Sequence, residues 1–284
     1  MSRILLLVIA LEAACDLTHR EVCMAAPIDP QQEARVIALL EEAGDVLLNF
    51  WPGKAESVSG ALQVSIKADG TQVSEADHAS NQIVIDGLAS LFPDDLVLSE
   101  ELEVPAGAKD AARLWILDPL DGTKHFINGT DNFSILLGLC IDGTPQAGFM
   151  YYPARSTLVC ANGGTRINGA RVGVSDNRTF GTDSICVRGA VLGSRAEIIK
   201  DKVESGRALF ELCRGGFDGV VLKIGKMATW DVAAPVAAVL QSGGRVTDER
   251  GEPFDLRRAT LESGFLVASN GYLHDQLLKI LADH

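Results

Sequence analysis

The chain has 284 residues, of which 47% are hydrophobic, so it can bury a substantial core as one large domain or two small ones. Its net charge of −13 argues against a nucleic-acid polymer as partner, because such partners are bound through basic patches. The same charge leaves room for a small anionic substrate, since metal ions held by carboxylates can attract a phosphate.

The six cysteines are dispersed, with neither a Cys-x-x-Cys pair nor a spacing typical of a zinc site. A long acidic chain with scattered cysteines is typical of a reduced, cytoplasmic protein. We therefore expect a cytoplasmic location and no membrane association.

Residues 1–28 are expected to be an N-terminal extension. An apolar run at 4–11 follows Arg3 and is shorter than the about 20 residues that cross a bilayer. It resembles a weak signal peptide, but Glu12 interrupts the small-residue cleavage pattern. The two interpretations are a secretion segment and an upstream extension with Met24 as an alternative start, and the second is favoured.

Helical and extended patterns alternate from residue 29 onwards. Asp29 and Pro30 are typical of a helix start, and helical spacing continues to Phe50, before Pro52-Gly53. Ser74 is placed to cap a second helix. Further helices are predicted at 208–214, 232–241 and 272–281, and strands at 62–66, 96–98, 133–140, 146–152, 158–161, 220–222, 245–247 and 265–268.

This mixture of helices, strands and hairpins predicts a layered α/β fold with at least one mixed sheet. Asp142-Gly143 is typical of a hairpin turn. Residues 29–284 are predicted to form one unit with two subdomains, about 29–165 and 166–284. Residues 176–205 carry the weakest pattern.

A rigid corner is predicted where the apolar run of Ile116 and Leu117 ends in Asp118-Pro119-Leu120-Asp121-Gly122-Thr123. Pro119 is expected to stop the strand because it cannot donate to the ladder, and Gly122 permits a tight turn. Two carboxylates and a hydroxyl are then held together. Such oxygen ligands suit Mg²⁺.

Three other acids, Asp77, Glu100 and Asp231, stand where a strand or turn meets a loop or helix. Each alone also fits an ordinary role: an acid in a first helical turn, a solvated loop charge and a helix cap, respectively. Taken with Asp118 and Asp121, they predict acids that converge on a pair of divalent cations.

The order of these motifs resembles the inositol monophosphatase superfamily from about residue 33 to the C-terminus. The matching segments are Lys67…Asp77, Ser99-Glu100-Glu101, 118–123 and Trp230-Asp231-Val232-Ala233-Ala234 with Gly243-Gly244. The resemblance implies a layered αβαβα sandwich with mixed sheets. It also implies a Mg²⁺-dependent, lithium-sensitive phosphomonoesterase that forms a homodimer.

The resemblance further implies which residues hold two or three Mg²⁺ ions. Glu100, Asp118 and the backbone carbonyl of Leu120 would bind the first ion. Asp118 would bridge to a second ion, which Asp121 and Asp231 would also hold. Bridging carboxylates suit this role because they compensate the charge of two adjacent cations.

The implied catalytic groups surround those ions. Asp77 would lie near a third, weaker ion, and Thr123 would orient or deprotonate the attacking water with Glu100 nearby. Backbone amides after Gly122 would bind the phosphate oxygens at a helix start. Ser74 replaces the threonine that is usual in the family and keeps the hydroxyl.

Three lysines indicate which kind of substrate is bound. Lys124-His125-Phe126 resembles the 3′(2′),5′-bisphosphate nucleotidase branch, whereas the inositol branch more often has Thr-Asn-Phe. Lys124, Lys223 and Lys226 would bind the phosphate that is not cleaved, although each alone also fits a solvated surface lysine. The favoured substrate is therefore adenosine 3′,5′-bisphosphate, which would lose its 3′-phosphate.

Several alternatives stay open because residues 178–222 align poorly with either branch. Gly193-Ser194 and Ser205-Gly206 are both candidates for the start of the substrate-side helix. The alternatives are an inositol-1-monophosphatase, a sugar bisphosphatase, a histidinol-phosphate phosphatase and an inactive phosphate-binding homologue.

Overall fold

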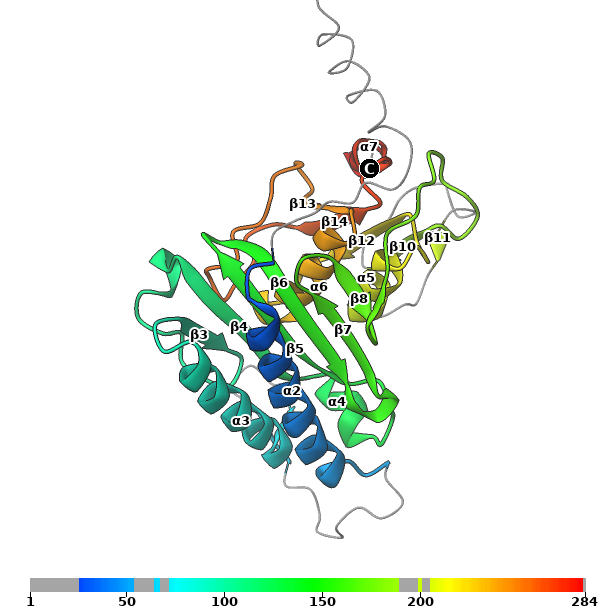
Figure 1. Ribbon diagram of the computed structural model, residues 1–284. Coiled ribbons are helices and arrows are strands. Elements are labelled where there is room, and N and C mark those ends of the chain that lie inside the picture. The colour runs from blue at the N-terminus through cyan, green and yellow to red at the C-terminus, as the bar shows by residue number, and fades with distance from the viewer. Residues whose placement is uncertain (1–25, 54–63, 67–71, 189–198, 201–204, 283–284) are drawn as a thin grey trace, which may run out of the picture.

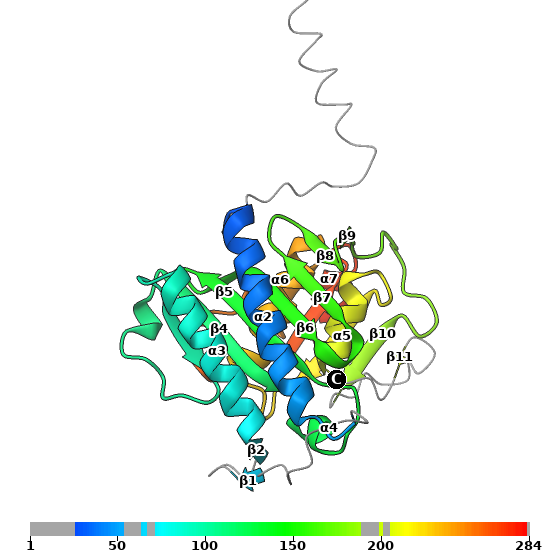
Figure 2. The same cartoon turned by 60° about the horizontal axis from the view of Figure 1, so that its bottom comes forward.

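The computed structural model describes residues 26–53, 64–66, 72–188, 199–200 and 205–282, which form five layers (Figures 1 and 2). Helices α2 (Pro30–Phe50) and α3 (Glu75–Leu91) cover one face of a seven-stranded sheet. Helices α5 (Ser205–Cys213) and α6 (Thr229–Gln241) lie between it and a five-stranded sheet. Helix α7 (His274–Ala282) packs on the far side of the small sheet, so the predicted αβαβα sandwich is confirmed.

The large sheet has the strand order β3-β4-β5-β6-β7-β8-β9. Only β3 and β4 run parallel, so the sheet is mixed as predicted. Asp142 and Gly143 have positive φ and form the predicted hairpin turn between β5 and β6. The strands are β3 (Leu96–Ser99), β4 (Arg113–Asp121), β5 (Ser134–Ile141), β6 (Thr144–Tyr152), β7 (Thr157–Ala161), β8 (Thr165–Ile167) and β9 (Ala170–Arg171).

The small sheet has the order β11-β10-β12-β14-β13. Its first three strands are parallel, and the pairs with β14 are antiparallel. The strands are β10 (Ile185–Arg188), β11 (Ile199–Lys200), β12 (Gly219–Lys223), β13 (Arg245–Asp248) and β14 (Phe265–Ser269). The pattern-poor segment 176–205 therefore contributes β10 and β11, strands of four and two residues that are too short to show a period. The predicted subdomain division near residue 165 stays a prediction.

The remaining elements are short. Strands β1 (Val64–Ile66) and β2 (Gln72–Ser74) form an antiparallel pair before α3. Helix α4 (Thr123–Ile127) follows β4, and single 3₁₀ turns lie at Ala108–Asp110 and Pro153–Arg155.

The start of α2 follows from its sequence. One Asp29 side-chain oxygen accepts from the backbone N–H groups of Gln31 and Gln32 at 2.8 Å each. The Gln32 side chain accepts in return from the Asp29 N–H, which completes a capping box. The helix ends at Phe50, before Pro52-Gly53, as predicted.

Strand β4 lies beside the edge strand β3 of the large sheet and contributes to a hydrophobic core on each face of that sheet. Trp115 and Leu117 face α2 and α3, whereas Leu114 and Ile116 face α5 and α6. All four are fully buried. This alternation is the period-two pattern of a strand with a helical layer on each face.

The expectation that Pro119 stops this strand is wrong. Strand β4 continues to Asp121, with a register shift between Asp118, which pairs with Leu136, and Asp121, which pairs with Ser134. Proline is tolerated there because a bulge leaves residues without a ladder partner. The Pro119 carbonyl accepts instead from the Ser80 hydroxyl at 2.8 Å.

The N-terminal residues 1–25, and with them the predicted signal-like run, lie outside the described residues. Ile28, the last residue of the predicted extension, is buried. Its backbone N–H donates to Asn162 at 3.3 Å, and its carbonyl accepts from the Asn162 amide at 3.0 Å. Among the described helices, none is both long and apolar enough to cross a membrane.

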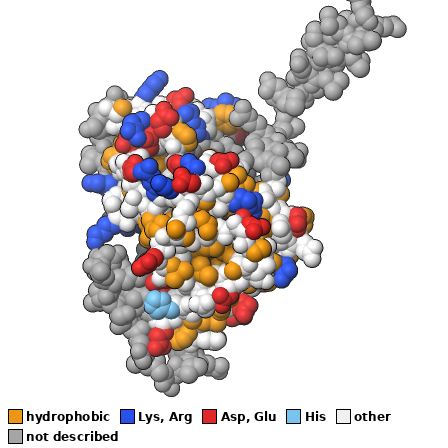
Figure 3. Space-filling view, turned by 90° about the vertical axis from the view of Figure 1, so that its left-hand side faces the viewer, with side chains coloured by type: hydrophobic (Ala, Val, Ile, Leu, Met, Phe, Trp, Pro, Cys, Tyr) orange, Lys and Arg blue, Asp and Glu red, His pale blue; other side chains and the backbone are white. Residues whose placement is uncertain are grey.

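Figure 3 shows the side of the molecule that lies at the left in Figure 1, next to the edge strand β3. Hydrophobic side chains gather in the middle of this face, and charged side chains surround them. Leu102 and Val104, which follow β3, have exposed fractions of about half. The expected homodimer stays a prediction.

Candidate active site

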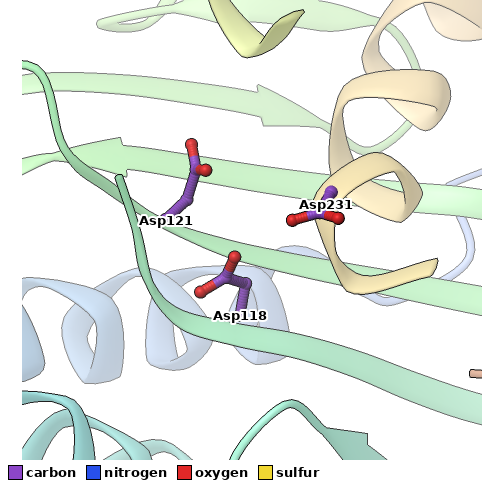
Figure 4. Close-up of side chains that lie close together, drawn as sticks. All are labelled: Asp118, Asp121 and Asp231. Atoms are coloured by element: carbon purple, nitrogen blue, oxygen red, sulfur yellow. The ribbon is translucent and has the colours of Figure 1, made fainter. Parts of the chain in front are cut away.

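Asp118 and Asp121 point to the same side of β4 because of the bulge (Figure 4). In a regular strand, residues three positions apart point to opposite faces. Between these acids, three steps along β4 match only two steps along β5, from Leu136 to Ser134. The extra residue turns Asp121 back to the face of Asp118. Proline between the two acids thus redirects a side chain rather than ending the strand.

Both acids are held by neighbouring donors. One Asp118 side-chain oxygen accepts from the Leu120 backbone N–H at 3.0 Å. The Ser134 hydroxyl donates to Asp121 Oδ2 at 3.1 Å from the adjoining strand β5. Asp118 and Ser134 are buried, so these side chains have little freedom to rotate.

Asp231 reaches the same place from the first turn of α6. Its Oδ2 atom accepts from the Ala228 backbone N–H at 2.5 Å, which satisfies a donor at the start of the helix. Asp118, Asp121 and Asp231 each offer one oxygen, and these oxygens lie within 4.8 Å of one another. Figure 4 shows the three carboxylates turned toward a common space. The predicted convergence of these three acids is present.

Glu100 approaches from β3. Because β3 and β4 are parallel, they end at the same edge of the sheet, and the Glu100 N–H donates to the Leu117 carbonyl at 3.1 Å. Glu100 is half-buried and is not one of the three acids that meet within 4.8 Å among the described residues. Its charge nevertheless reaches the cluster and contributes to raising the pKa of Asp118 and of Asp231.

Burial is the largest influence on the pKa values of these acids, and crowding of like charge adds to it. Burial raises the pKa of Asp118 well above its usual value, and the charges of Glu100, Asp121 and Asp231 raise it further. Burial also raises the pKa of Asp231 to about 7, with Asp121 and Glu100 adding to the effect while the Ala228 N–H opposes it. Four acids this close favour a bound cation, which would stabilise their ionised forms.

Asp77 and Thr123 meet on the α3 side of the corner. The Thr123 hydroxyl lies 3.1 Å from the Leu120 carbonyl and 3.4 Å from Asp77 Oδ1, with geometry suited to donating to either. Asp77 is buried in the first turn of α3. The carbonyl and the two side chains that the family resemblance singles out therefore share one hydrogen-bond network. The side chain of Ser74 lies outside the described residues.

Gly122 makes the turn from β4 into α4. Its φ is 82°, and a Cβ there would lie 2.7 Å from the Asn132 carbonyl oxygen, so both the dihedral and the space require glycine. The N–H groups of His125 and Phe126 donate to the Gly122 carbonyl at 2.8 and 3.1 Å. The backbone beyond the two acids is thereby fixed.

A cavity of about 550 Å³ opens beside the acids. Asp121 and Asp231 line it, together with Gly122, as predicted for the site. Four cationic residues also line it and are exposed: Arg188, Arg207, Lys223 and Lys226. The cavity wall therefore carries both carboxylates and cations, which suits an anion with more than one charged group.

Two of the predicted lysines are among these four, whereas Lys124 and Thr123 are not among the lining residues. Lys124 is exposed on α4, and its neighbour His125 lines the cavity instead. His125 Nδ1 lies 3.1 Å from the Thr130 hydroxyl. His125 is not among the residues that the sequence predicts for the site.

Arg188 and Arg207 were also missed. Arg188 ends β10 within the pattern-poor segment, and Arg207 lies in the first turn of α5. The candidate helix start Ser205-Gly206 does begin α5, and a Cβ on Gly206 would lie 3.6 Å from Asp121 Oδ2. A search for cations directly after that start would have found Arg207. The other candidate, Gly193-Ser194, lies outside the described residues.

A model of the inositol monophosphatase family matches residues 30–284. The chain belongs to this family. It is 29% identical to the Thermotoga maritima protein named fructose-1,6-bisphosphatase/inositol-1-monophosphatase, over 86% of this chain and 93% of the relative. It is 30% identical to the Escherichia coli 3′(2′),5′-bisphosphate nucleotidase CysQ, over 82% of this chain and 98% of that enzyme.

Solved structures agree with this assignment. The inositol monophosphatase of Thermotoga maritima superposes with a TM-score of 0.70 at 28% identity, covering 87% of this chain and 95% of that one. Relatives named for a sugar bisphosphate and for a nucleotide bisphosphate match about equally well. Family membership therefore makes this protein a metal-dependent phosphomonoesterase. It does not determine the substrate, which depends on the residues that line the cavity.

The inositol monophosphatase family depends on Mg²⁺, and the residues present suit that ion. Mg²⁺ takes oxygen ligands and usually one or two protein carboxylates together with substrate phosphate. The cluster supplies three converging carboxylates from two rigid elements, with Glu100 close enough to raise the pKa of two of them. No sulfur or imidazole ligand belongs to this group of described residues.

Proposed function

We propose that this protein hydrolyses the 3′-phosphate of adenosine 3′,5′-bisphosphate in a Mg²⁺-dependent reaction. One observation carries the proposal: a single cavity is lined by two carboxylates of the acidic cluster and by four cations. Carboxylates with their ions suit the phosphate that is cleaved. The cations suit a second phosphate, which inositol 1-phosphate lacks.

The ion-binding roles follow the family pattern. Glu100, Asp118 and the Leu120 carbonyl would hold a first ion, and Asp118 would bridge to a second ion held by Asp121 and Asp231. The 4.8 Å convergence of the three aspartates supports such a shared site. When bound, Mg²⁺ supplies charge neutralisation at the phosphoryl oxygens and lowers the pKa of water.

The chain's own groups would prepare the water that attacks phosphorus. The Thr123 oxygen would take a proton from that water while the Thr123 hydroxyl passes its own proton to the Asp77 carboxylate. Glu100 would be a second acceptor from the β3 side. Asp77 would also bind near a third ion, and the turn at Gly122 would present backbone amides to the phosphate.

The second phosphate would lie among Lys223, Lys226, Arg188 and Arg207. Arg207 also pairs with Glu211 at 2.9 Å, which offsets part of its charge. Neither lysine forms an ion pair with any residue that the structure describes. We therefore assign the two lysines the larger share of the second phosphate's binding. Lys124 on α4 would act from outside the cavity wall, by long-range attraction.

Phosphate release from matched substrates tests the proposal. Adenosine 3′,5′-bisphosphate, adenosine 3′-monophosphate and inositol 1-phosphate would each be assayed with Mg²⁺, with a chelator and with added Li⁺. A charge-assisted hydrogen bond contributes about 1.5–3 kcal/mol, so the bisphosphate should exceed the 3′-monophosphate in kcat/KM by about 10–100-fold. We expect the chelator and Li⁺ to inhibit.

The panel also separates the alternatives. A kcat/KM that is higher for inositol 1-phosphate would reject the nucleotide substrate and favour the inositol branch, to which the 28% identical solved structure belongs by name. Fructose 1,6-bisphosphate and histidinol phosphate complete the panel. Binding of the bisphosphate without release of phosphate from any compound would show an inactive homologue.

A further inference from the structure

Two glycines lie directly beneath α6. Gly138 on β5 and Gly148 on β6 are both buried and are register partners across the two strands. A Cβ on Gly138 would lie 2.7 Å from the Ala233 Cβ and 3.0 Å from the Ala234 nitrogen. A Cβ on Gly148 would collide with the Ala234 carbonyl oxygen and lie 3.0 Å from the Ala237 Cβ.

These contacts cannot be relieved by rotating a side chain. The opposing atoms are helix backbone and alanine Cβ atoms, which have no rotamers. The φ angles of Gly138 and Gly148 are not positive, so their backbone conformation does not itself require glycine. Glycine weakens the interior of a strand and often marks a close backbone approach. Here it forms a flat patch, two strands wide, on which α6 rests.

This patch lies between the elements that carry the acids. Gly138 of β5 pairs with Ile116 of β4, which lies two residues before Asp118. Asp118 itself pairs with Leu136 of β5. On the helix, Asp231 precedes Ala233 by two residues. The separation of α6 from the sheet therefore sets the separation of Asp231 from Asp118 and Asp121.

We propose that Gly138 and Gly148 are positioning residues that set the spacing of the metal-binding carboxylates. The inference rests on the proposed metal site. A methyl group on Gly138 pushes against Ala233 and Ala234, directly after the first turn of α6, and moves Asp231 away from Asp118. A methyl group on Gly148 also pushes against Ala234, but its other contact lies further along the helix, at Ala237, so it moves Asp231 less.

Direct Mn²⁺ binding to the metal-free protein, followed by electron paramagnetic resonance, tests this without an activity assay. Changes next to metal ligands commonly weaken metal affinity by about 10–100-fold, and we expect a loss in this range for Gly138→Ala. Gly148→Ala should show a smaller loss. Gly219→Ala is the control at a strand glycine outside the cavity lining, because its Cβ would crowd only the end of the Leu277 side chain, at 2.9 Å, on the α7 side of the small sheet. It should leave Mn²⁺ affinity unchanged.

A second-site change separates positioning from general destabilisation. Ala233→Gly removes the atom nearest to the new methyl group, so Gly138→Ala/Ala233→Gly should regain part of the Mn²⁺ affinity. Its Tm should fall further, because glycine destabilises a helix interior. A merely structural role would instead make affinity and Tm fall together.

The outcomes distinguish the two proposals. If the wild-type protein binds no Mn²⁺, or Asp231→Asn binds it as well as the wild type, the proposed metal site fails. If the wild type binds and folded Gly138→Ala binds equally tightly, the positioning role of Gly138 is wrong. Should Gly138→Ala not fold, an unchanged affinity in Gly148→Ala overturns the inference in the same way.

Discussion

The carboxylate cluster and the cations that line the cavity, here called the acidic end and the basic end of the site, are built in different ways. At the acidic end, Asp118 and Asp121 come from a bulge in the buried strand β4, and Asp231 comes from a helix packed tightly on the same sheet. Their positions are fixed by buried backbone. The basic end consists of exposed arginine and lysine side chains from β10, α5, β12 and the turn after β12.

This difference suggests that the acidic end cleaves the phosphate and that the basic end recognises the substrate. Carboxylates that hold two cations must keep fixed distances, so a rigid buried scaffold suits them. Long exposed cations can adjust to a phosphate, and solvent and salt screen their charge. We therefore expect changes at the acidic end to abolish turnover of every substrate. Changes at the basic end should alter the preference among substrates.

The largest effect is expected for Asp231→Asn. The change keeps the shape but removes one negative charge from a site meant for divalent cations. Loss of preorganised electrostatic groups costs about 10²–10³-fold or more in kcat, and a shared metal ligand should reach the upper end. Turnover should fall by at least about 10³-fold for all substrates in the panel. Substrate-independent loss is the decisive observation, measured by phosphate release at saturating Mg²⁺.

A binding-only protein would respond differently. Asp231→Asn would then change only the affinity for phosphate compounds, measured by calorimetry, since there would be no turnover to lose. Asp275→Asn on α7 is the matched control, because it removes a carboxylate from an exposed position outside the cavity. A comparable loss in this control would mean that general charge, and not the cluster, matters.

The second prediction concerns Lys223→Gln/Lys226→Gln. Removing two cations that contact the second phosphate should lower kcat/KM for adenosine 3′,5′-bisphosphate by about 100-fold. The value for adenosine 3′-monophosphate should change by less than about threefold, because that substrate has no second phosphate. Lys279→Gln on α7 removes a positive charge at an exposed position outside the cavity and serves as control.

A change in ionic strength is a further test of the difference between the acidic end and the basic end. Exposed charges are screened over about 8–10 Å at physiological salt, so the preference for the bisphosphate should shrink as salt rises. The turnover defect of Asp231→Asn should persist at high salt. If Lys223→Gln/Lys226→Gln lost kcat/KM equally for the bisphosphate and the monophosphate, the two lysines would instead act at the phosphate that is cleaved.

The acidic end was predictable from sequence because its signals are local. Asp118-Pro119-Leu120-Asp121 places two ligands within four residues, and Trp230-Asp231 opens a clear helix. What the sequence did not reveal was the bulge that keeps β4 going past Pro119, since bulges depend on the partner strand. The layered fold followed from long, regular helices and strands.

The basic end was only half predictable. Lys223 and Lys226 stand near the tryptophan motif, but Arg188 follows a four-residue strand, and only the fold brings it to the cavity. Conversely, Lys124 looked promising because it adjoins the acidic motif, yet α4 leaves it outside the lining. Proximity in the sequence identified the motif of the metal ligands, but it did not identify the residues that line the cavity.

A third, smaller effect is expected for Ser134→Ala. The Ser134 hydroxyl donates to Asp121 from the neighbouring strand at 3.1 Å and is buried. Removing a partner that orients a metal ligand should weaken Mg²⁺ affinity by about tenfold, read from the Mg²⁺ dependence of kcat and from Mn²⁺ binding. The ratio of kcat/KM between bisphosphate and monophosphate should not change.

Ser242→Ala is the matched control for that variant. Its hydroxyl donates to the Val239 carbonyl at 2.8 Å, at the opposite end of α6 from Asp231. Unchanged Mg²⁺ affinity in Ser134→Ala would mean that the bulge alone fixes Asp121. A changed substrate ratio would mean that the acidic end also recognises the second phosphate.

The smallest effect concerns stability below pH 7 and involves a residue outside the cavity lining. His274 is buried between the Thr247 hydroxyl, 2.8 Å from Nε2, and the Ser269 hydroxyl, 3.0 Å from Nδ1. Burial lowers its pKa from 6.5 to about 4, with Arg245 adding to the effect and Asp275 opposing it. The unfolded chain therefore binds this proton at a higher pH than the folded protein does.

The direction of the change in stability with pH follows from the linkage between proton binding and unfolding. Between pH 6.5 and 4 the unfolded state takes up more protons, so the stability contributed by neutral His274 is complete above pH 6.5 and is lost as pH falls toward 4. Tm should therefore drop between pH 7 and pH 5 in the wild type, and drop less in His274→Gln, which cannot be protonated. Equal slopes of Tm against pH in the two proteins would contradict this assignment. Because the acids of the cavity are unchanged in this variant, the measurement also separates the fold's own response to pH from that of the active site.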